Sequence, residues 1–558
     1  MTVSLAPVAT DANSSTEKPA LVIRNYSLSY RTDNGLVSAL KNIDLTIGKG
    51  QTVGLVGESG SGKSSMAWSV MRYLPPNAVE TGGAIRLAGE EMLDFSPRQM
   101  ADIRGSRMSM VFQDPSTSLN PTIRIGEQIA EVLMRHRGLT KIEAYAYAEA
   151  ALARTGITRP KEMLGRYPHE ASGGEKQRVV IATAFACEPE LIIFDEPTTA
   201  LDILTARQIL DLFNQLREET NVSALYISHD LGLVSRVVDE VSVIHKGVIV
   251  ESGPVQDVFR RPKADYTRQL IGAVPNPDRW IGVDAPAVPE TLVKLDDVGV
   301  RYGAPTKLQK LFWPKDSETT GFWGAKGVNI DIRKGELLGV VGESGSGKST
   351  IAKVLAGLQD FEGRLEFAGK TFANRKDIDR AYRRRVQLVF QHPDASLNPR
   401  QRIGTIIGRP LKLYGVVPAD KVAARVAELL EMVRLPADYA KRYPHQLSGG
   451  EKQRVAIARA FAAEPDLVIC DEVTAALDVS VQAAVAELLV KLQKDTGTAC
   501  VFITHDLNLI RQLAHRIAVM HHGKLVDFFD RPDARSDDRD AYTKALLDAV
   551  PVPEAAIA

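Results

Sequence analysis

Short, continuous apolar runs recur along the chain, and each ends in a polar or glycine-rich stretch. Thr52–Val56, Leu191–Phe194 and Ala224–Ile227 have this form in the first half, and Leu337–Val341 has it in the second. A strand of a parallel sheet is covered on both faces, so it needs an uninterrupted apolar sequence. These runs therefore predict buried strands of a parallel sheet.

Other segments show the strand or the helix period. Residues 21–31 alternate between apolar and polar, and 83–89 and 108–112 are short strand-like runs. From Ile125 onward, apolar residues fall at the spacing of one helical face (Ile125, Ile129, Val132 and Leu133). The pattern predicts an α/β fold in which residues 115–187 form a helical subdomain inserted between strands.

The two halves of the chain correspond to each other residue by residue. Four pairs lie at a constant spacing of 276 positions (448 minus 172): Ser172 and Ser448, Asp195 and Asp471, His229 and His505, Tyr266 and Tyr542. The chain is therefore predicted to hold two homologous domains in tandem, residues 20–274 and 292–558.

The remaining segments connect or extend these domains. Residues 1–19 are predicted to be disordered, and residues 275–291 form a proline-rich, semi-rigid linker. Between Tyr302 and Gly327 the second half carries an insertion with two aromatic clusters. It is either a surface loop with a small apolar cluster of its own or a contact for a partner protein.

Composition excludes several classes of protein. Lys plus Arg and Asp plus Glu are equal at 69 each, so the basic excess typical of nucleic-acid binders is missing. No apolar stretch is long enough to cross a membrane, and the N-terminus does not have the pattern of a signal peptide. Three cysteines without metal-site spacing predict reduced thiols in a cytosolic protein.

The pattern GxxxxGK[ST] occurs twice, at residues 57–64 and 342–349, each time between a predicted strand and a predicted helix. Such a loop points its backbone N–H groups at phosphate oxygens, its lysine reaches the β- and γ-phosphates, and its Ser/Thr hydroxyl binds Mg²⁺. A flexible surface loop is the alternative, which two copies in matching contexts disfavour. The candidate ATP-binding residues are Ser59, Gly60, Gly62, Lys63, Ser64 and Ser65 in the first loop, and Ser344, Gly345, Gly347, Lys348, Ser349 and Thr350 in the second.

Two further motifs fit phosphoryl transfer. Asp195-Glu196 and Asp471-Glu472 end apolar strands, which suits a metal-binding aspartate beside a glutamate that polarises the attacking water. A helix-capping pair is the alternative. Residues 172–175 and 448–451 place a hydroxyl and free N–H groups at a helix N-terminus, either as a second anion site or as a flexible helix cap.

Taken together, these motifs resemble the nucleotide-binding subunits of ABC transporters along nearly the whole length of both halves. The Walker A loop, the Q-loop glutamine (Gln113, Gln391), the signature (171–175, 447–451), Walker B, the D-loop aspartate (Asp202, Asp478) and the H-loop histidine (His229, His505) occur twice in order. The resemblance implies two P-loop NTPase domains, each with a mainly parallel core sheet, an antiparallel β subdomain and the inserted helical subdomain.

The resemblance also implies roles for individual residues. The two domains would pair head to tail, so that each ATP lies between one Walker A loop and the signature of the other domain, with Mg²⁺ near the Q-loop glutamine. Tyr30 and Tyr302 stand where the family stacks adenine on an aromatic ring, although either residue could be an ordinary strand residue. Site one would combine Lys63, Asp195, Glu196 and His229 with Ser448, Gly449 and Gly450; site two would combine Lys348, Asp471, Glu472 and His505 with Ser172, Gly173 and Gly174.

Finer features resemble the oligopeptide/dipeptide importers within the family. These are the sequences FQDP and SLNP around the first Q-loop, FQHP and SLNP around the second, and the tails that begin at Tyr266 and Tyr542. The resemblance implies an ATPase at the cytoplasmic face of the cell membrane. Its partners would be two transmembrane permease subunits and an extracytoplasmic binding protein, with uptake of a peptide or similar solute. A soluble ABC ATPase acting on ribosomes or DNA, and an exporter ATPase, are the alternatives.

The two halves depart from the family pattern to different extents. Ala171 replaces the usual signature leucine, Glu175 and Glu451 replace the commoner glutamine, and Thr183 takes the place of the arginine found at Arg459. Val473 also replaces the proline found at Pro197. Because both glutamates of the Asp-Glu pairs and both histidines are intact, we expect two competent sites of unequal rate.

Overall fold

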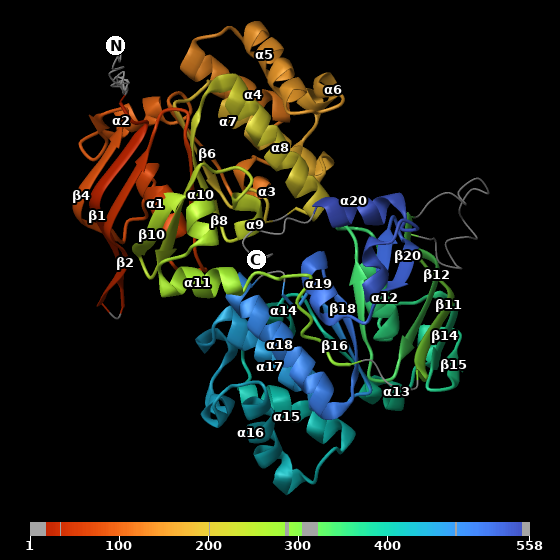
Figure 1. Ribbon diagram of the computed structural model, residues 1–558. Helices are drawn as coiled ribbons and strands as arrows, with labels where there is room; N and C mark the ends of the chain where they lie inside the picture. Colours follow the sequence, from red (N-terminus) through yellow and green to blue (C-terminus); the bar gives the residue numbers. More distant parts are fainter. Residues whose placement is uncertain are drawn as a thin grey trace, which may run out of the picture. The chain divides into compact units, whose positions relative to one another are not determined.

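The computed structural model describes residues 18–33, 35–199, 201–284, 289–303, 322–474 and 477–549. The chain divides into two compact units: the first comprises residues 1–200, 211–228 and 234–258, and the second comprises 201–210, 229–233 and 259–558. Each unit contains an antiparallel sheet, a mainly parallel sheet and a group of helices (Figure 1). The predicted α/β fold is confirmed. Residues 1–17 of the N-terminal segment and 304–321 of the insertion lie outside the described residues.

The antiparallel sheet of the first unit has the strand order β2-β1-β4-β5. Leu21, Ile23, Tyr26 and Leu28 of β1 are buried, as the alternating pattern predicts, and their spacing changes at irregularities in the pairing with β2. The strands are β1 (Leu21–Thr32), β2 (Gly35–Ile47), β4 (Ala78–Leu87) and β5 (Glu90–Glu91).

The larger sheet of the first unit has the order β10-β9-β3-β8-β7-β6 and is parallel except for the β9–β10 pair. Every residue of β3, β7 and β8 is buried, which confirms the prediction from their apolar runs. Since β3, β8 and β7 are parallel neighbours, their carboxyl ends meet at one edge of the sheet. The strands are β3 (Thr52–Val56), β6 (Met108–Val111), β7 (Leu191–Asp195), β8 (Ser223–Ser228), β9 (Glu240–His245) and β10 (Val248–Pro254).

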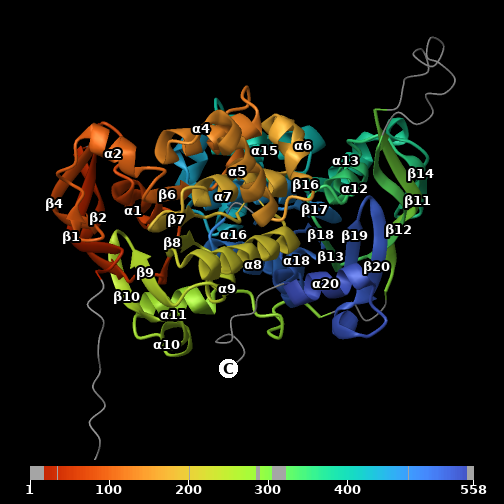
Figure 2. The same ribbon diagram turned by 90° about the horizontal axis from the view of Figure 1, so that it is seen from above.

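In the sequence, a helical subdomain connects β6 to β7, as predicted, and Figure 2 shows its helices α4 to α7 close together. Gly138, with a φ of 67°, ends α4, and Thr140 begins α5 with a capping box to Glu143. Its helices are α3 (Pro115–Ser118), α4 (Ile125–Arg137), α5 (Lys141–Arg154), α6 (Pro160–Gly165) and α7 (Gly173–Phe185). The other helices up to the linker are α1 (Lys63–Val70), α2 (Pro97–Ile103), α8 (Ile203–Thr220), α9 (Leu231–Val234), α10 (Val255–Arg260) and α11 (Asp265–Gly272).

The second unit repeats these strand orders as β12-β11-β14-β15 and β16-β17-β18-β13-β19-β20. Its strands are β11 (Thr291–Tyr302), β12 (Phe322–Arg333), β13 (Leu337–Val341), β14 (Glu362–Phe367), β15 (Lys370–Phe372), β16 (Val386–Val389), β17 (Leu467–Asp471), β18 (Ala499–Ile503), β19 (Arg516–His521) and β20 (Lys524–Asp530). Its helices are α12 (Lys348–Leu355), α13 (Arg380–Arg385), α14 (Pro393–Ser396), α15 (Ile403–Tyr414), α16 (Val422–Met432), α17 (Gly449–Phe461), α18 (Val479–Thr496), α19 (Leu507–Leu513) and α20 (Ala541–Ala549). Across the ranges that the structure describes, no helix is both long and apolar enough to cross a membrane.

The parallel sheet of the second unit separates two apolar cores. Val468 and Cys470 of β17 belong to the core that includes the helices α15 to α19, whereas Leu467 and Ile469 belong to the core shared with the antiparallel sheet and α12. Successive side chains of a strand point to opposite faces, so one apolar run supplies both cores. Because both faces of these strands are buried, their sequences do not alternate between apolar and polar residues.

The described end of the predicted insertion is part of a strand. Residues 322–326 belong to β12 and pair with β11, so the prediction of a surface loop is wrong for them. The apolar ring of Trp323 is flanked by the cationic groups of Arg301 and Lys326, 5.8 and 5.6 Å from its centre.

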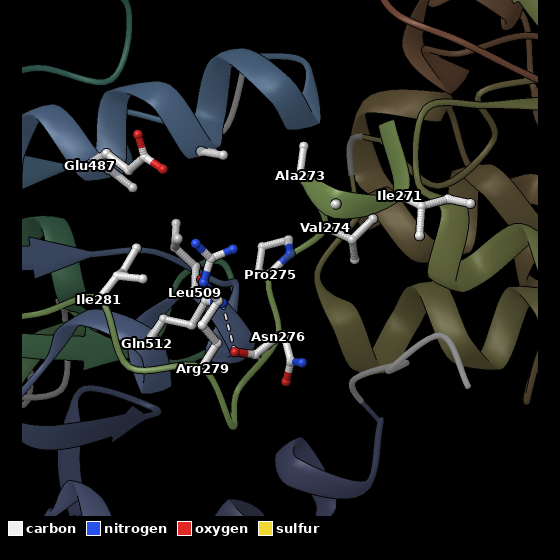
Figure 3. Close-up of a pocket in the computed structure, with 13 residues that line it drawn as sticks. Ile271, Ala273, Val274, Pro275, Asn276, Arg279, Ile281, Glu487, Leu509 and Gln512 are labelled. Carbon is white, nitrogen blue, oxygen red and sulfur yellow. Dashed lines mark hydrogen bonds between the residues drawn. The ribbon is translucent and has the colours of Figure 1, made fainter. Parts of the chain in front are cut away.

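The first part of the linker packs against α19 and the start of β19. The Gln512 side-chain amide donates to the backbone O of Asn276 at 2.6 Å, and the N–H of Ile281 donates to the backbone O of Gln512 at 3.0 Å. The Trp280 ring meets the His515 ring edge to face, with centroids 5.8 Å apart. A cavity of about 220 Å³ lies between this segment and the residues Glu487 and Leu509 (Figure 3).

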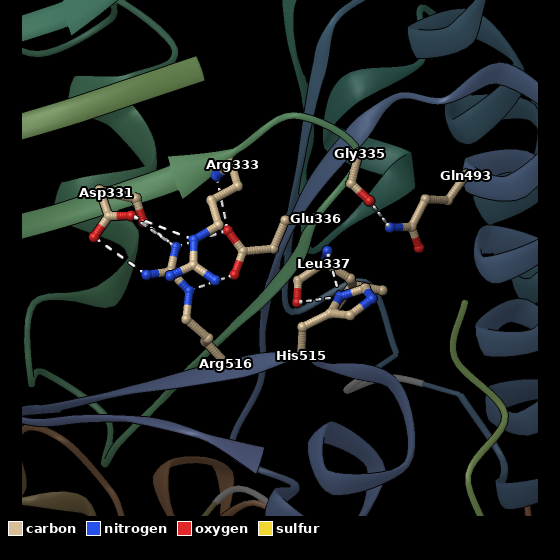
Figure 4. Close-up of polar contacts among 8 residues, drawn as sticks. All are labelled: Asp331, Arg333, Gly335, Glu336, Leu337, Gln493, His515 and Arg516. Atoms are coloured by element: carbon tan, nitrogen blue, oxygen red, sulfur yellow. Dashed lines mark hydrogen bonds and ion pairs between the residues drawn. The ribbon is translucent and has the colours of Figure 1, made fainter. Parts of the chain in front are cut away.

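A buried arginine links the two sheets of the second unit. Arg516, at the start of β19, binds both carboxylate oxygens of Glu336, at 2.5 and 2.8 Å, and also Asp331 of β12 at 2.9 Å (Figure 4). The side chains of Arg516 and Glu336 are only 7% and 2% exposed. Glu336 also accepts the backbone N–H of Arg333, so its buried carboxylate is itself well hydrogen-bonded.

We predict that Glu336→Gln destabilises the second unit by about 1–3 kcal/mol, because it removes the buried carboxylate and leaves Asp331 as the charged partner of the guanidinium. Chemical denaturation followed by circular dichroism measures the loss. The matched control is Asp360→Asn, which breaks the Arg375–Asp360 pair, whose side chains are 44% and 69% exposed. The control should cost no more than about 1 kcal/mol. Equal stability of the two variants would contradict the role given to the buried pair.

Candidate functional site

The two glycine-rich loops connect a buried strand to a helix, as β3–α1 and β13–α12. Gly60 and Gly62 have φ values of 74° and 112°, and Gly345 and Gly347 have values of 80° and 103°. Residues with a side chain rarely adopt these conformations, so the curl of each loop depends on glycine. At Gly62 a Cβ would also lie 2.9 Å from the backbone O of Ala39.

The lysine of each loop is buried within the curl of its own backbone. Lys63 Nζ donates to the backbone O atoms of Gly57 and Glu58 at 2.7 and 2.9 Å. Lys348 Nζ donates to those of Gly342 and Glu343 at 2.8 and 2.6 Å. Burial lowers the pKa of Lys348, and the neighbouring carboxylates oppose that shift. A buried ammonium with neutral carbonyl partners is an attractive place for an anion.

The aspartates of the Asp-Glu pairs lie beside the loop hydroxyls. Ser64 Oγ donates to Asp195 at 3.4 Å, and Ser349 Oγ donates to Asp471 at 3.0 Å. Burial, with a contribution from the adjacent Glu196, raises the pKa of Asp195 to about 6, and burial also raises the pKa of Asp471. A cation at this position would offset the cost of burying each carboxylate.

The glutamates of the pairs have an unusual backbone conformation, which the sequence did not predict. Glu196 and Glu472 have φ values of 50° and 49°. This left-handed region costs a residue with a side chain roughly 1–2 kcal/mol, and such strain gathers at functional sites. The N–H of each glutamate donates to the last apolar residue of the neighbouring strand, Ile227 or Ile503, at 2.9 Å, which holds the turn in place.

This conformation turns each glutamate towards its loop lysine and its Q-loop glutamine. Glu196 lies 3.8 Å from Lys63 Nζ and accepts from Gln113 Nε2 at 3.1 Å. The second unit repeats the arrangement at Glu472, with Lys348 at 4.0 Å and Gln391 at 2.8 Å. Lysine, hydroxyl, aspartate, glutamate and glutamine therefore converge in both units.

The signature residues lie on a different element, at the start of α7 and of α17. Ser172 and Ser448 are the N-caps and form capping boxes with Glu175 and Glu451. The glutamates that replace the family's commoner glutamine thus close the helix ends. A Cβ at Gly173 or Gly449 would meet nothing within 4 Å, whereas one at Gly450 would lie 2.6 Å from the side chain of Val481.

The remaining predicted site residues lie near the loops or at the sheet edge. His229 directly follows β8, and His505 follows β18 after one intervening residue. Tyr30 donates its hydroxyl to Ser65 at 3.1 Å, and the hydroxyls of Tyr302 and Thr350 are 3.3 Å apart. The Tyr302 ring also stacks on Phe322, with centroids 5.3 Å apart.

These side chains fit a nucleoside triphosphate and Mg²⁺. Each loop offers backbone N–H groups and a buried ammonium, which match phosphate oxygens. The hydroxyl, carboxylate and amide oxygens beside it are hard donors of the kind that Mg²⁺ prefers when phosphates complete its shell. Within the described residues, no cluster of three or more His, Cys, Asp or Glu suggests a metal held by protein alone.

A contact in the second unit joins the signature helix to the Q-loop segment. Arg459 of α17 donates to the backbone O of Ser396 at 2.5 Å, and Lys452 pairs with Asp394 at 2.7 Å. In the first unit, Thr183 takes the place of Arg459 and bonds to Val179 within its own helix, while Ser116 stands in place of Asp394. The replacement of arginine by threonine was visible in the sequence, but its partner was not.

The chain is similar to known proteins along most of its length. The family model described as "ABC transporter" matches residues 40–199 and 325–475, and the model "Oligopeptide/dipeptide transporter, C-terminal region" matches residues 250–300. The glutathione import ATP-binding protein GsiA of Escherichia coli (strain K12) is 38% identical over 96% of this chain and 90% of its own length. The GsiA protein of Shigella flexneri has the same identity and coverage. The dimeric structure of MJ0796, a bacterial ABC transporter cassette, covers 42% of this chain and 98% of its own, with 27% identity and a TM-score of 0.39.

We predict that Arg459→Thr loosens the contact between α17 and the segment that starts with α14. The substitution gives the second unit the threonine that the first unit has at the corresponding position. Amide hydrogen exchange of residues 393–397 should become faster, while exchange in the strands of the same unit stays unchanged. Thr183→Ser is the matched control: it keeps the hydroxyl bond to Val179 and should leave exchange in residues 115–119 as it was. Unchanged exchange at 393–397 in Arg459→Thr would contradict the contact.

Proposed function

This chain belongs to the ABC transporter family, and from that premise we propose that it is the ATP-hydrolysing subunit of an importer for a peptide or similar small solute. The observation that carries the proposal is the convergence of a buried lysine, a hydroxyl and an Asp-Glu pair in both units. The oligopeptide/dipeptide match at residues 250–300 and the GsiA relatives, whose name refers to glutathione import, support a peptide-like solute.

The residues of each unit have distinct roles in hydrolysis. Lys63 and the loop N–H groups bind and orient the phosphates, and Glu196 takes a proton from the water that attacks the γ-phosphorus. The bond from that phosphorus to the β-phosphate oxygen breaks as the new P–O bond forms, which yields ADP and phosphate. Such reactions depend mainly on positioning and on charge stabilisation. The turn at Glu196 therefore matters, because it aims the carboxylate before substrate arrives.

Mg²⁺ would be held by Ser64, Asp195 and Gln113 in the first unit, and by Ser349, Asp471 and Gln391 in the second. When bound, it supplies a Lewis acid that draws electron density from the phosphate oxygens. Gln113 and Gln391 bond to the glutamates in this structure, so each would exchange that partner for the ion.

We further propose that each ATP is completed by the signature of the opposite domain. Ser448, Gly449 and Gly450 would face the loop of Lys63, while Ser172, Gly173 and Gly174 would face the loop of Lys348. The open space beside Gly173 and Gly449, in the first turn of each helix, supports this, since a helix N-terminus attracts phosphate. Tyr30 and Tyr302 would stack on adenine, and because one face of Tyr302 packs on Phe322, only its other face is available.

The partners follow from the proposed import. Two transmembrane permease subunits and an extracytoplasmic binding protein would supply the pore and the choice of solute, with this chain at the cytoplasmic face of the membrane. Residues 20–274 and 292–558 would be the two ATPase domains. Phe112 and Phe390 are exposed beside the Q-loop glutamines and are suited to contact the permeases.

Affinity purification of the tagged chain from detergent-solubilised membranes of its own host tests this function. Two integral membrane proteins should be recovered with it, and ATPase activity should rise when they are reconstituted with their binding protein. Phe112→Ala combined with Phe390→Ala should lower that recovery, whereas Tyr73→Ala, which removes another exposed aromatic ring, should not. Recovery with ribosomes or DNA and without a permease would overturn the proposal.

A further inference from the structure

The C-terminal helix of the second unit brings a tyrosine to the glycine-rich loop. Tyr542, in the first turn of α20, accepts a hydrogen bond on its hydroxyl oxygen from the backbone N–H of Glu343 at 3.0 Å. Its ring stacks on His521, at the end of β19, with centroids 3.9 Å apart and 12° between the planes. The sequence marked this tail as a feature of the importer subgroup but assigned it no role.

The peptide group that Tyr542 binds is the one that holds the loop lysine. The N–H of Glu343 and the carbonyl of Gly342 belong to the same planar peptide, so fixing the direction of one fixes the other. That carbonyl accepts from Lys348 Nζ at 2.8 Å. The peptide therefore lies between Tyr542 on one side and the lysine on the other.

Because residue 342 is a glycine, the orientation of this peptide depends on a contact from another part of the fold. Gly342 has a φ of 150°, and a Cβ there would lie 2.1 Å from the backbone O of Met520. The close approach of β19 requires glycine, yet glycine restrains its own dihedral angles least. A hydrogen bond from elsewhere in the fold then decides how the carbonyl points.

Tyr542 is itself held firmly. Arg539 pairs with Asp527 of β20 at 2.9 Å, and the N–H of Asp540 donates to the same carboxylate at 3.0 Å. Asp540 in turn accepts the N–H of Tyr542 at 2.8 Å, and Leu546 anchors α20 in the apolar core. Figures 1 and 2 both show α20 beside β20. Burial raises the pKa of Tyr542 to about 12, so its hydroxyl stays neutral at ordinary pH.

We propose that Tyr542 is a positioning residue of the second ATP site, which orients the Gly342–Glu343 peptide and thereby places Lys348 for the phosphates of ATP. The proposal rests on the proposed function only in assuming that the second loop binds ATP. It assigns the C-terminal tail a direct part in the nucleotide site. A shift of α20 would reach Lys348 through a single peptide group.

Tyr542→Phe tests this, because it keeps the ring and its stacking on His521 but removes the acceptor. Binding is measured with ATP and Mg²⁺ in the Lys63→Ala background, so that the second loop dominates the signal. The dissociation constant for ATP should rise about 3- to 10-fold, as expected for one neutral hydrogen bond. Hydrogen exchange at the amide of Glu343 should become faster, and the thermal midpoint should fall by no more than about 4 °C, the change expected for the loss of about 1 kcal/mol in a domain of this size.

Tyr414→Phe is the matched control, since it removes a hydroxyl that donates to the backbone O of Arg383 at 3.3 Å, outside the nucleotide site. Its ATP affinity should equal that of the parent. Unchanged affinity in Tyr542→Phe would overturn the inference, and so would a loss of affinity that Tyr414→Phe reproduces or that a larger fall in thermal midpoint accompanies. If the Lys63→Ala parent binds no ATP, the proposed function of the second loop fails instead.

Discussion

A lysine ammonium buried inside its own loop is the interaction on which the rest of each unit depends. The buried ammonium groups of Lys63 and Lys348 donate to two backbone carbonyls each in place of water, and these carbonyls carry no net charge. Such burial is costly unless negative charge lies near, and Glu196 and Glu472 supply it at about the distance of a weak ion pair. The same ammonium is what a triphosphate would bind. The features that stabilise the loop without nucleotide thus also prepare it for nucleotide.

The strand order explains how the fold brings these few functional groups together. Lys63 and Glu196 lie far apart in the sequence and meet only because β3 and β7 both flank β8 in parallel. The helical subdomain occupies the long connection that leads from β6 to β7 and carries the signature at its last helix. In the second unit, Arg516 of the parallel sheet binds the buried Glu336 and also pairs with Asp331 of the antiparallel sheet.

Local patterns predicted the parts of this structure that depend on nearby residues. The strand Thr52–Val56 and the one that ends at Asp195 were predictable because two-sided burial requires a continuous apolar run. The left-handed turn of Glu196 was not, since it depends on a bond to Ile227 of a neighbouring strand. The contacts of Arg459 with Ser396 and of Tyr542 with Glu343 join residues remote in sequence, so no local pattern could reveal them. The sequence revealed the chemistry of each loop but not the contacts that hold the loop in position.

The central claim is that both units hold a competent hydrolytic site, although their surroundings differ. Steady-state ATP hydrolysis by Glu196→Gln and Glu472→Gln, each made alone and then together, tests it most directly. The account predicts that each single variant keeps part of the activity, to unequal extents, and that the double variant loses about 100-fold or more. If Glu196→Gln alone abolished turnover while Glu472→Gln left the rate untouched, the second unit would bind nucleotide without hydrolysing it, and the claim would be contradicted.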